Sequence, residues 1–259
     1  MKTLEKIRDE ILNGHLYYLR NVSIDNVIFG YHNKELKVLL QCPQGIRKWV
    51  LSGGYIKRNE SIDESAKRIA KERTGLDNLF LTQFMAFGNP DRTKDSDISV
   101  KVLKKLIDPQ KVKDFWIFDY FVSIGYYTLT EFEQVKPSGE FNMEECQWWD
   151  IKKLPPMLFD HKEILVAALK AMRLHLYHYP VGYELLPQKF TLPEIHTLYE
   201  TILGKKLDSR NFAKKLIFTG IIKKLKERRK IGPHRSPFLY VFDRVKYNKA
   251  LKNGMVLAI

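Results

Sequence analysis

The sequence is poor in cysteine and has no long apolar run. Its 259 residues include only two cysteines, Cys42 and Cys146, which lie far apart and form no spacing of the metal-binding kind. This usage favours a reduced, cytosolic setting. No stretch approaches the roughly 18 apolar residues that a membrane helix requires, and residues 1–21 mix charges of both signs among their apolar positions. We therefore expect a cytoplasmic protein with no signal peptide and no membrane partner.

Negative charge is scarce in the C-terminal part of the chain. Lys and Arg outnumber Asp and Glu by 44 to 30 overall. Residues 181–259 hold 17 of the basic and 6 of the acidic residues, whereas residues 1–180 hold 27 and 24. This asymmetry indicates a polyanionic partner for the C-terminal part. The alternative is a basic surface that merely keeps the protein in solution.

One stretch combines a loop, a helix and a stop. It runs from Gly54 to Leu76 with the sequence GYIKRNESIDESAKRIAKERTGL. Ser61 is the expected N-cap, and Glu64 three residues later completes a capping box. Apolar residues recur at helical spacing at positions 62, 66, 69 and 70, which predicts one buried stripe. Gly75 is expected to cap the C-terminus.

Six residues of this stretch resemble the Nudix box. The family pattern is G-x5-E-x7-R-E-U-x-E-E-x-G-U, where U is a bulky aliphatic residue. The matching positions are Gly54, Glu60, Arg68, Glu72, Gly75 and Leu76. In that family the glutamates of the R-E-U-x-E-E run hold a divalent metal against a diphosphate. Ile69 and Arg73 stand here in place of two of these glutamates.

These two replacements predict that the box has lost its metal chemistry. Mg²⁺ takes oxygen ligands, and carboxylates supply the charge that holds it. Ile69 removes one ligand, and Arg73 places a positive charge where the ion would sit. Metal-assisted attack of water on a pyrophosphate then lacks its electrophile. We therefore expect no metal, no cofactor, no catalytic residue and no working Nudix hydrolase.

Two alternatives stay open for the box. It could be an ordinary amphipathic helix whose spacing matches the family by coincidence. The chain could also be an active Mg²⁺-dependent Nudix pyrophosphohydrolase acting on a nucleoside diphosphate derivative. In that case Glu60 and Glu72 would need carboxylates from elsewhere, for example Asp91 or Glu144.

Strand-like runs surround the box helix. They cover residues 23–29, 36–41, 79–87, 116–129 and 147–151, and amphipathic helices are expected at 4–20 and 162–178. Strands around one helix predict an α/β (α+β) fold, which is a Nudix-type α/β/α sandwich if the resemblance holds. The HYPVG sequence breaks the last helix. We therefore expect two domains, at residues 1–180 and 181–259.

The C-terminal part has the order of a winged helix-turn-helix, which makes it a second, smaller domain. A helix is expected to begin after Thr191, and a second helix is expected at residues 209–219. Short strands at 221–226 and 238–242 then flank the basic loop KERRKIGPHRSP. In proteins of this architecture the second helix presents side chains to the major groove of DNA.

The outward face of the second helix and the basic loop carry the residues expected to bind DNA. Arg can read guanine and Asn can read adenine, while Lys more often meets phosphate. The helix candidates are Ser209, Arg210, Asn211, Lys214 and Lys215, and the wing candidates are Arg228, Arg229, Lys230, His234 and Arg235. One alternative is a solvated helix face beside a basic loop. Another is an RNA-binding module, although the tail has no RNP-type aromatic pattern.

Two longer segments resemble the Nudix-related transcriptional regulators known as NrtR-like. They are WWDIKKLPP…FDHKEIL and FTLPEIHTLYETILGKKLDSRNFAKKLIFTGII. The resemblance implies an effector-sensing Nudix-like domain, a winged helix that binds a double-stranded DNA operator, and a homodimer. The implied effector is an ADP-ribose-type NAD metabolite or a sugar, with Arg73 and Arg92 as candidate contacts.

Two further expectations concern the first domain. His161 is expected to be structural rather than a catalytic base. The lysine-rich residues 94–114, with a short helix expected at 99–107, are longer than the connection expected in these regulators. This segment could cover the cleft or extend the dimer contact.

Overall fold

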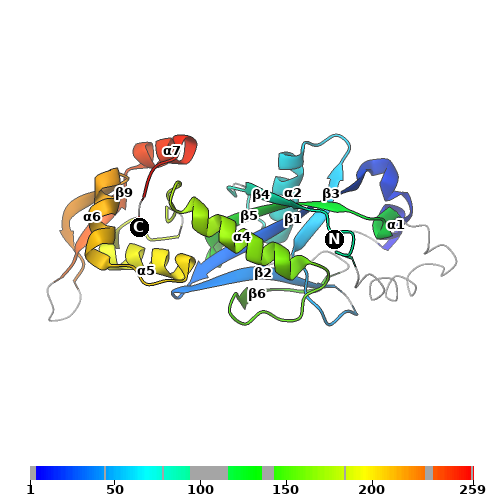
Figure 1. The fold of residues 1–259 in the computed structure, drawn as a ribbon, viewed down its shortest axis with the longest axis horizontal. Coiled ribbons are helices and arrows are strands. Elements are labelled where there is room, and N and C mark those ends of the chain that lie inside the picture. The colour runs from blue at the N-terminus through cyan, green and yellow to red at the C-terminus, as the bar shows by residue number, and fades with distance from the viewer. Residues whose placement is uncertain are drawn as a thin grey trace. The chain divides into compact units, whose positions relative to one another are not determined.

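The chain forms two compact units. The computed structural model describes residues 4–43, 45–77, 79–93, 116–135, 143–183, 185–230, 236–257 and 259 (Figure 1). The first unit consists of Met1–His32 and Lys37–Ala168, and the second consists of Asn33–Leu36 and Leu169–Ile259. The division falls inside helix α4 (His161–His175), earlier in the chain than the boundary expected after residue 180. The last turns of this helix belong to the second unit, where Arg173 Nε donates to the Ile202 carbonyl at 2.9 Å.

A mixed sheet forms the centre of the first unit. Its described strands are β1 (Tyr18–His32), β2 (Glu35–Pro43), β3 (Ser52–Lys57), β4 (Thr82–Phe87), β5 (Val122–Glu131) and β6 (Met143–Asp150). They are ordered β4-β5-β1-β2-β6, with β3 paired to β1. Strand β5 runs parallel to β1, whereas β3 is antiparallel to β1 and β4 to β5. Residues 24–30 of β1 are all buried, as expected for a strand covered on both faces.

Helices cover both faces of this sheet. The Asn26 side-chain amide on β1 donates to the Ala66 carbonyl of helix α2 (Ile62–Thr74) at 3.0 Å. The neighbouring residue, Asp25, meets His161 at the start of α4. Successive residues of a strand point to opposite faces, so α2 and α4 lie on opposite sides of the sheet. The first unit is therefore the α/β/α sandwich that the sequence predicts.

The box helix begins and ends at its predicted caps. Ser61 and Glu64 form the capping box, and Gly75 adopts a left-handed φ of 74° while its N–H donates to the Lys71 carbonyl. Glycine suits this position because residues with a Cβ are strained at positive φ. The buried stripe includes positions 66, 69 and 70. Ile62 does not join it, since its side chain is 39% exposed.

The second unit has the predicted winged-helix topology. Its elements are β7 (Phe190–Thr191), α5 (Leu192–Leu203), α6 (Ser209–Thr219), β8 (Ile222–Arg228), β9 (Phe238–Phe242) and α7 (Arg244–Asn253). The three strands form one sheet in the order β7-β9-β8. Thr191 and Glu194 form a second capping box at the start of α5. Helix α7 is an element that the sequence analysis does not predict.

Most predicted elements begin or end a few residues away from the expected positions, and two of them differ more clearly. Helix α1 ends at Tyr17 (Leu4–Tyr17), and strand β1 starts at the next residue. The long strand expected at 116–129 starts only at Val122, and a short 3-10 helix, η2 (Trp116–Phe118), precedes it. The Trp116 ring of η2 packs against Tyr18 and Tyr55. A second such turn, η3 (Phe132–Gln134), follows β5. The helix expected at 99–107 lies outside the described residues. None of the helices that the structure describes is long and apolar enough to cross a membrane.

Candidate functional site

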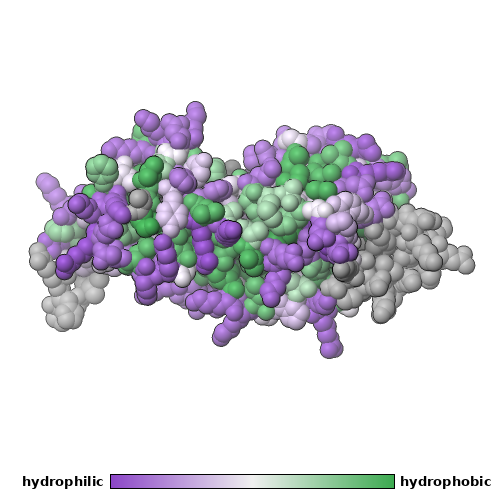
Figure 2. All heavy atoms as spheres, in the orientation of Figure 1, coloured by the Kyte–Doolittle hydropathy of each residue, from purple (hydrophilic) through white to green (hydrophobic). Residues whose placement is uncertain are grey.

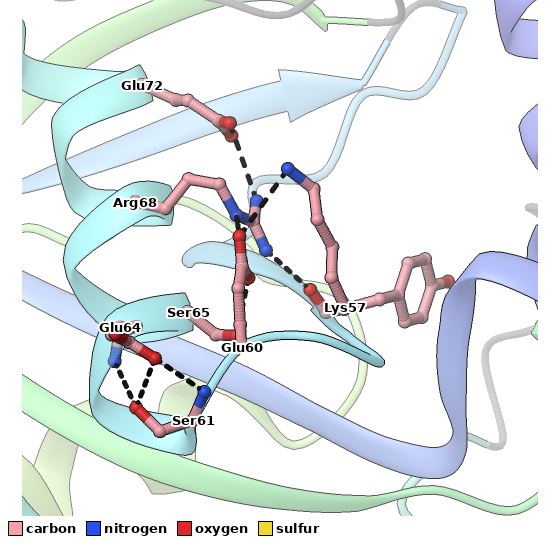
Figure 3. Close-up of polar contacts among 8 residues, drawn as sticks. Lys57, Glu60, Ser61, Glu64, Ser65, Arg68 and Glu72 are labelled. Atoms are coloured by element: carbon pink, nitrogen blue, oxygen red, sulfur yellow. Dashed lines mark hydrogen bonds and ion pairs between the residues drawn. The ribbon is translucent and has the colours of Figure 1, made fainter.

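Arg68 is the centre of the box (Figure 3). Its Nε donates to both carboxylate oxygens of Glu60 at 2.8 and 3.0 Å, and its Nη1 lies 3.4 Å from Glu72 Oε1. A third hydrogen bond of 2.9 Å runs from Nη2 to the Tyr55 carbonyl of β3. One guanidinium therefore joins the loop before α2, the helix itself and the neighbouring strand.

Glu60 is held in its charged form. The Ser65 hydroxyl donates to it at 2.8 Å, and Lys57 Nζ lies 3.5 Å away. Partial burial by itself would raise the pKa of Glu60, but the hydrogen bonds from Arg68 and Ser65, helped by the charges of Arg68 and Lys57, lower it to about 2. The carboxylate stays ionised at neutral pH, and both of its oxygens bind protein donors.

The two box positions that lack the family glutamate, Ile69 and Arg73, are buried. Ile69 is 1% exposed and packs with Ile24, Ile56 and other residues between α2 and the sheet. A Cβ on Gly54 would lie only 2.9 Å from Ile69 Cδ1, so the glycine admits the isoleucine side chain. Arg73 is 3% exposed.

These residues do not fit a magnesium site. Mg²⁺ requires near-octahedral oxygen coordination, whereas both retained glutamates bind Arg68 and the other two positions supply an alkyl group and a cation. In the described part of the chain, no group of three or more His, Cys, Asp or Glu side chains is close enough to hold a metal ion.

A second polar cluster lies on the opposite face of the sheet, around Arg92. The Arg92 guanidinium donates to the two carboxylate oxygens of Asp160 at 2.9 and 3.0 Å, and to the Phe121 carbonyl at 3.1 Å. Its Nη2 also lies 3.5 Å from Asp25 Oδ2, which accepts a short hydrogen bond from the Ser123 hydroxyl. Arg92 is only 7% exposed. We call Asp25, Arg92, Ser123, Asp160 and His161 the buried ionic cluster.

His161 completes this cluster as a neutral side chain. The Leu51 N–H donates to its Nδ1 at 3.1 Å, so the ring proton is on Nε2, which lies 3.6 Å from Asp25 Oδ1. Burial lowers the pKa of His161, and the nearby Arg92 acts in the same direction, while Asp25 and Asp160 oppose them. His161 thus links the start of α4 to the loop before β3.

The two effector candidates, Arg73 and Arg92, are both buried. Arg92 binds two carboxylates. An anionic effector would therefore have to compete with Asp25 and Asp160 for this guanidinium. Sequence reasoning missed these partners, although one signal was available: Asp25 is a charged residue inside the apolar run SIDNVIF, and a buried charge requires a partner.

Helix α6 presents the predicted DNA-binding face of the second unit. Asp208 caps it by accepting a 2.7 Å hydrogen bond from the Asn211 N–H. Phe212 and Leu216 are buried. The candidates Ser209, Arg210, Asn211 and Lys214 are exposed in its first turns, and Lys215 is half-buried. The helix thus places one guanidinium, one amide and one ammonium group on the same side.

The predicted wing residues do not all point to solvent. Arg229 pairs with Glu194, the capping residue of α5, and donates to the Lys189 carbonyl at 2.9 Å. Arg228 lies over the Phe238 ring at 3.8 Å and donates to the Ser236 carbonyl. Lys230 is exposed, while His234 and Arg235 lie outside the described residues. Arg229 therefore joins the wing to α5, a role that the sequence analysis did not foresee.

Comparisons with known proteins agree with this architecture. Residues 182–242 match the family model described as the NrtR DNA-binding winged helix domain. A curated relative, the ADPR responsive transcriptional repressor NtrR of Acinetobacter baylyi, is 25% identical over 235 residues, which cover 88% of this chain and 84% of the relative.

Solved structures share the fold. The chain is similar to Shewanella oneidensis NrtR complexed with a 27mer DNA, with a TM-score of 0.66 and 21% identity over 88% of this chain and 96% of that one. It is also similar to a MutT/nudix family protein from Enterococcus faecalis, with a TM-score of 0.60 and 21% identity over 94% and 100% of the two chains. Residues 182–242 thus match the NrtR winged-helix family, and the chain as a whole shares the fold of a Nudix-type unit joined to a winged helix. In sequence the chain is similar to the Nudix-related, NrtR-like regulators, as the Acinetobacter relative shows.

Arg92→Gln tests the buried ionic cluster. Removing the guanidinium leaves Asp25 and Asp160 buried without their counter-charge, so we expect the free energy of unfolding of the first unit to fall by about 3–5 kcal/mol. All four tryptophans, at positions 49, 116, 148 and 149, lie in this unit. Urea unfolding followed by tryptophan fluorescence therefore reports on it. Arg47→Gln, at an exposed arginine, is the matched control and should change the value by less than about 0.5 kcal/mol. Equal effects of the two variants would contradict a stabilising role for the cluster.

The neutral state of His161 predicts a pH dependence of stability. Because burial lowers its pKa below the ordinary value of 6.5, the unfolded chain binds a proton below that pH that the folded chain does not. The free energy of unfolding should therefore fall as the pH decreases from about 7 to 5, by up to about 1.4 kcal/mol per pH unit. His161→Asn keeps an acceptor for the Leu51 N–H and should flatten this part of the profile. Identical slopes for wild type and variant would show that His161 is protonated equally in both states.

Proposed function

We propose that this chain is a transcriptional regulator that binds operator DNA through α6 and its wing, and that a small effector bound by the Nudix-type unit changes this affinity. One observation carries the proposal: the segment that matches the NrtR winged helix includes α6, and α6 exposes Arg210, Asn211 and Lys214. Arginine and asparagine have the geometry to read base edges in the major groove, and lysine supplies charge for phosphate.

The effector class follows from the relatives. The Acinetobacter relative is described as responsive to ADPR, so an ADP-ribose-type nucleotide is the first candidate for this chain. A sugar is the second, since the family resemblance allows it. Arg73 and Arg92 stay predicted effector contacts, with the burial of both side chains implying that the effector enters or rearranges the core of the unit.

We further propose that the chain is not an enzyme and that the box is a structural remnant. The support is chemical. Arg68 forms ion pairs with both retained glutamates, Glu60 and Glu72. Ile69 fills the space between α2 and the sheet at the position where the family has a metal-binding glutamate. The alternative, Mg²⁺-dependent hydrolysis of a nucleoside diphosphate derivative, would require Glu60 and Glu72 to leave Arg68.

A homodimer is the proposed DNA-binding form. Two winged helices on one operator would bind two half-sites and multiply affinity and specificity. For the effector to control this dimer, it must bind the DNA-competent and incompetent forms with different affinities.

Fluorescence anisotropy with duplex DNA from upstream of the gene and its neighbours tests the proposal. We expect saturable binding that survives excess random-sequence duplex at near-physiological salt. We also expect the affinity for the duplex to change on addition of either ADP-ribose or one member of a panel of pentoses and hexoses. Complete removal of binding by the random duplex would contradict operator recognition and would show that the second unit binds polyanions without sequence preference. A preference for single-stranded RNA would favour the RNA-binding alternative. Mg²⁺-dependent release of AMP from ADP-ribose, lost in Glu72→Gln, would establish the hydrolase instead.

Two substitutions on α6 separate base reading from phosphate contact. Asn211→Ala should reduce the preference for operator over random DNA by about 1–3 kcal/mol, since a lost bidentate contact relaxes base choice. Lys214→Ala should weaken both duplexes alike and make the salt dependence shallower by about one unit of slope. Binding titrations at several salt concentrations measure both effects. Equal losses on operator and random DNA for Asn211→Ala would refute its role as a base reader.

A further inference from the structure

Helix α7 is a basic element outside the matched winged-helix segment. The match covers residues 182–242, whereas α7 spans Arg244–Asn253. Its sequence, RVKYNKALKN, contains four basic residues and no acidic one. The basic residues are Arg244, Lys246, Lys249 and Lys252, and all four are exposed. Figure 2 shows hydrophilic side chains projecting from the part of the surface where α7 lies.

The helix is firmly attached to the second unit, so its charges have fixed positions. Tyr247 and Ala250 are buried, and the Tyr247 hydroxyl donates to the Pro180 carbonyl at 3.0 Å. Asp243 caps the helix by accepting from the Lys246 N–H at 3.2 Å, and it pairs with Lys223 of β8 at 2.9 Å. These contacts hold one side of α7 against the unit and leave the opposite side to solvent.

The exposed side of α7 is a regular row of donors. Arg244, Asn248 and Lys252 follow one another at four-residue spacing, which places them on one stripe of the helix about one turn apart. Lys249 lies beside this stripe, five residues after Arg244. Such a row presents positive charge along a line rather than at a point.

Three of these cations differ from several other basic residues of the same unit, which form ion pairs. Arg229 pairs with Glu194, Lys189 with Glu227, and Lys206 with Glu200. By contrast, Arg244, Lys249 and Lys252 form no ion pair with any residue that the structure describes. Their charge is therefore available to an external anion.

The start of α7 lies beside the end of α6. Lys246, which is on α7 but outside the row, extends over the C-cap residue of α6, where a Cβ on Gly220 would lie 2.8 Å from its Nζ. The Asp243 N–H also donates to the Ile221 carbonyl, just after α6, at 2.8 Å. The start of α7 is thus held next to the C-terminus of the helix that carries Arg210, Asn211 and Lys214.

We propose that the exposed row of α7, formed by Arg244, Lys249 and Lys252, binds the phosphate backbone of duplex DNA beyond the bases that α6 reads. This inference rests on the proposed DNA-binding function and extends its interface. A line of uncompensated cations suits a polyanion of regular charge spacing, and lysine and arginine contacts to phosphate raise affinity without reading sequence.

The test compares the double variant Lys249→Gln/Lys252→Gln with wild type on two duplexes. One is the tightest-binding duplex from the region upstream of the gene, and the other is a scrambled duplex of equal length. We expect the slope of log K against log salt to become shallower by about two units, since each lost phosphate contact removes about 0.9. Both duplexes should lose affinity by the same factor. A retained preference for the upstream duplex shows that α6 is still folded and reading bases.

Lys67→Gln/Lys162→Gln is the matched control, because it removes the same charge from exposed positions of the first unit. It should leave the slope within about half a unit of wild type. A wild-type slope in the α7 variant would overturn the inference. The exposed charges of α7 would then not bind DNA, and an acidic protein surface would be the alternative partner. A loss confined to the upstream duplex would overturn it too, since α7 would then read bases. If the wild-type protein itself fails to prefer any upstream duplex, the proposed function fails first, which distinguishes the two results.

Discussion

The fold of the first unit depends on one buried guanidinium. Arg92 joins Asp25 of β1, the Phe121 carbonyl before β5 and Asp160 before α4. Taking these charges out of water is costly, and the cost is offset only while all of them stay together. The start of α4 is therefore held to the central strands of the sheet by electrostatics, in addition to the packing of Ile164 and Leu165 in the core.

The same helix ends in the second unit. There Arg173 donates to the Ile202 carbonyl at the end of α5, the first helix of the helix-turn-helix. One continuous helix thus has an ionic attachment near its first residue and a hydrogen-bonded guanidinium near its last. The buried residues of the helix divide in the same way, since Ile164 and Leu165 belong to the first unit and Met172 belongs to the second.

Arginine has three separate roles in the chain, and the surroundings of each side chain determine which role it has. Arg68 organises the box by holding the two glutamates that the family pattern retains. Arg229 joins the wing to the capping residue of α5. Arg210 and Arg244 lie exposed on α6 and α7. Among the described arginines of the second unit, Arg229 is therefore committed to a contact within the protein, whereas Arg210 and Arg244 form no ion pair with the described residues. A count of basic residues by itself overstates the positive charge that this unit offers to a partner.

The sequence by itself determined the local elements and the family resemblance. The capping box and glycine stop of α2, three of the four expected buried positions of the box helix and the order of the winged helix depend on residues a few positions apart, and such hydrogen bonds and periodicities can be recognised in a linear chain. The capping box of α5 has the same local character, although the sequence analysis did not predict it. The replacement of two box glutamates by Ile69 and Arg73 was visible for the same reason. The start of β5 was less predictable, because the aromatic residues before it form η2 and pack against Tyr18 and Tyr55, which are distant in the sequence.

Only the tertiary structure decided which charged side chains are buried and with whom they pair. Arg92 and Asp160 are 68 residues apart, and Arg229 and Glu194 are 35 apart. In the sequence these arginines resemble those exposed on α6 and α7. Their partners come together only when the sheet and the helices pack. The physical reason is that a charge buried in the core persists only beside a counter-charge, and long-range packing, rather than local pattern, places that counter-charge.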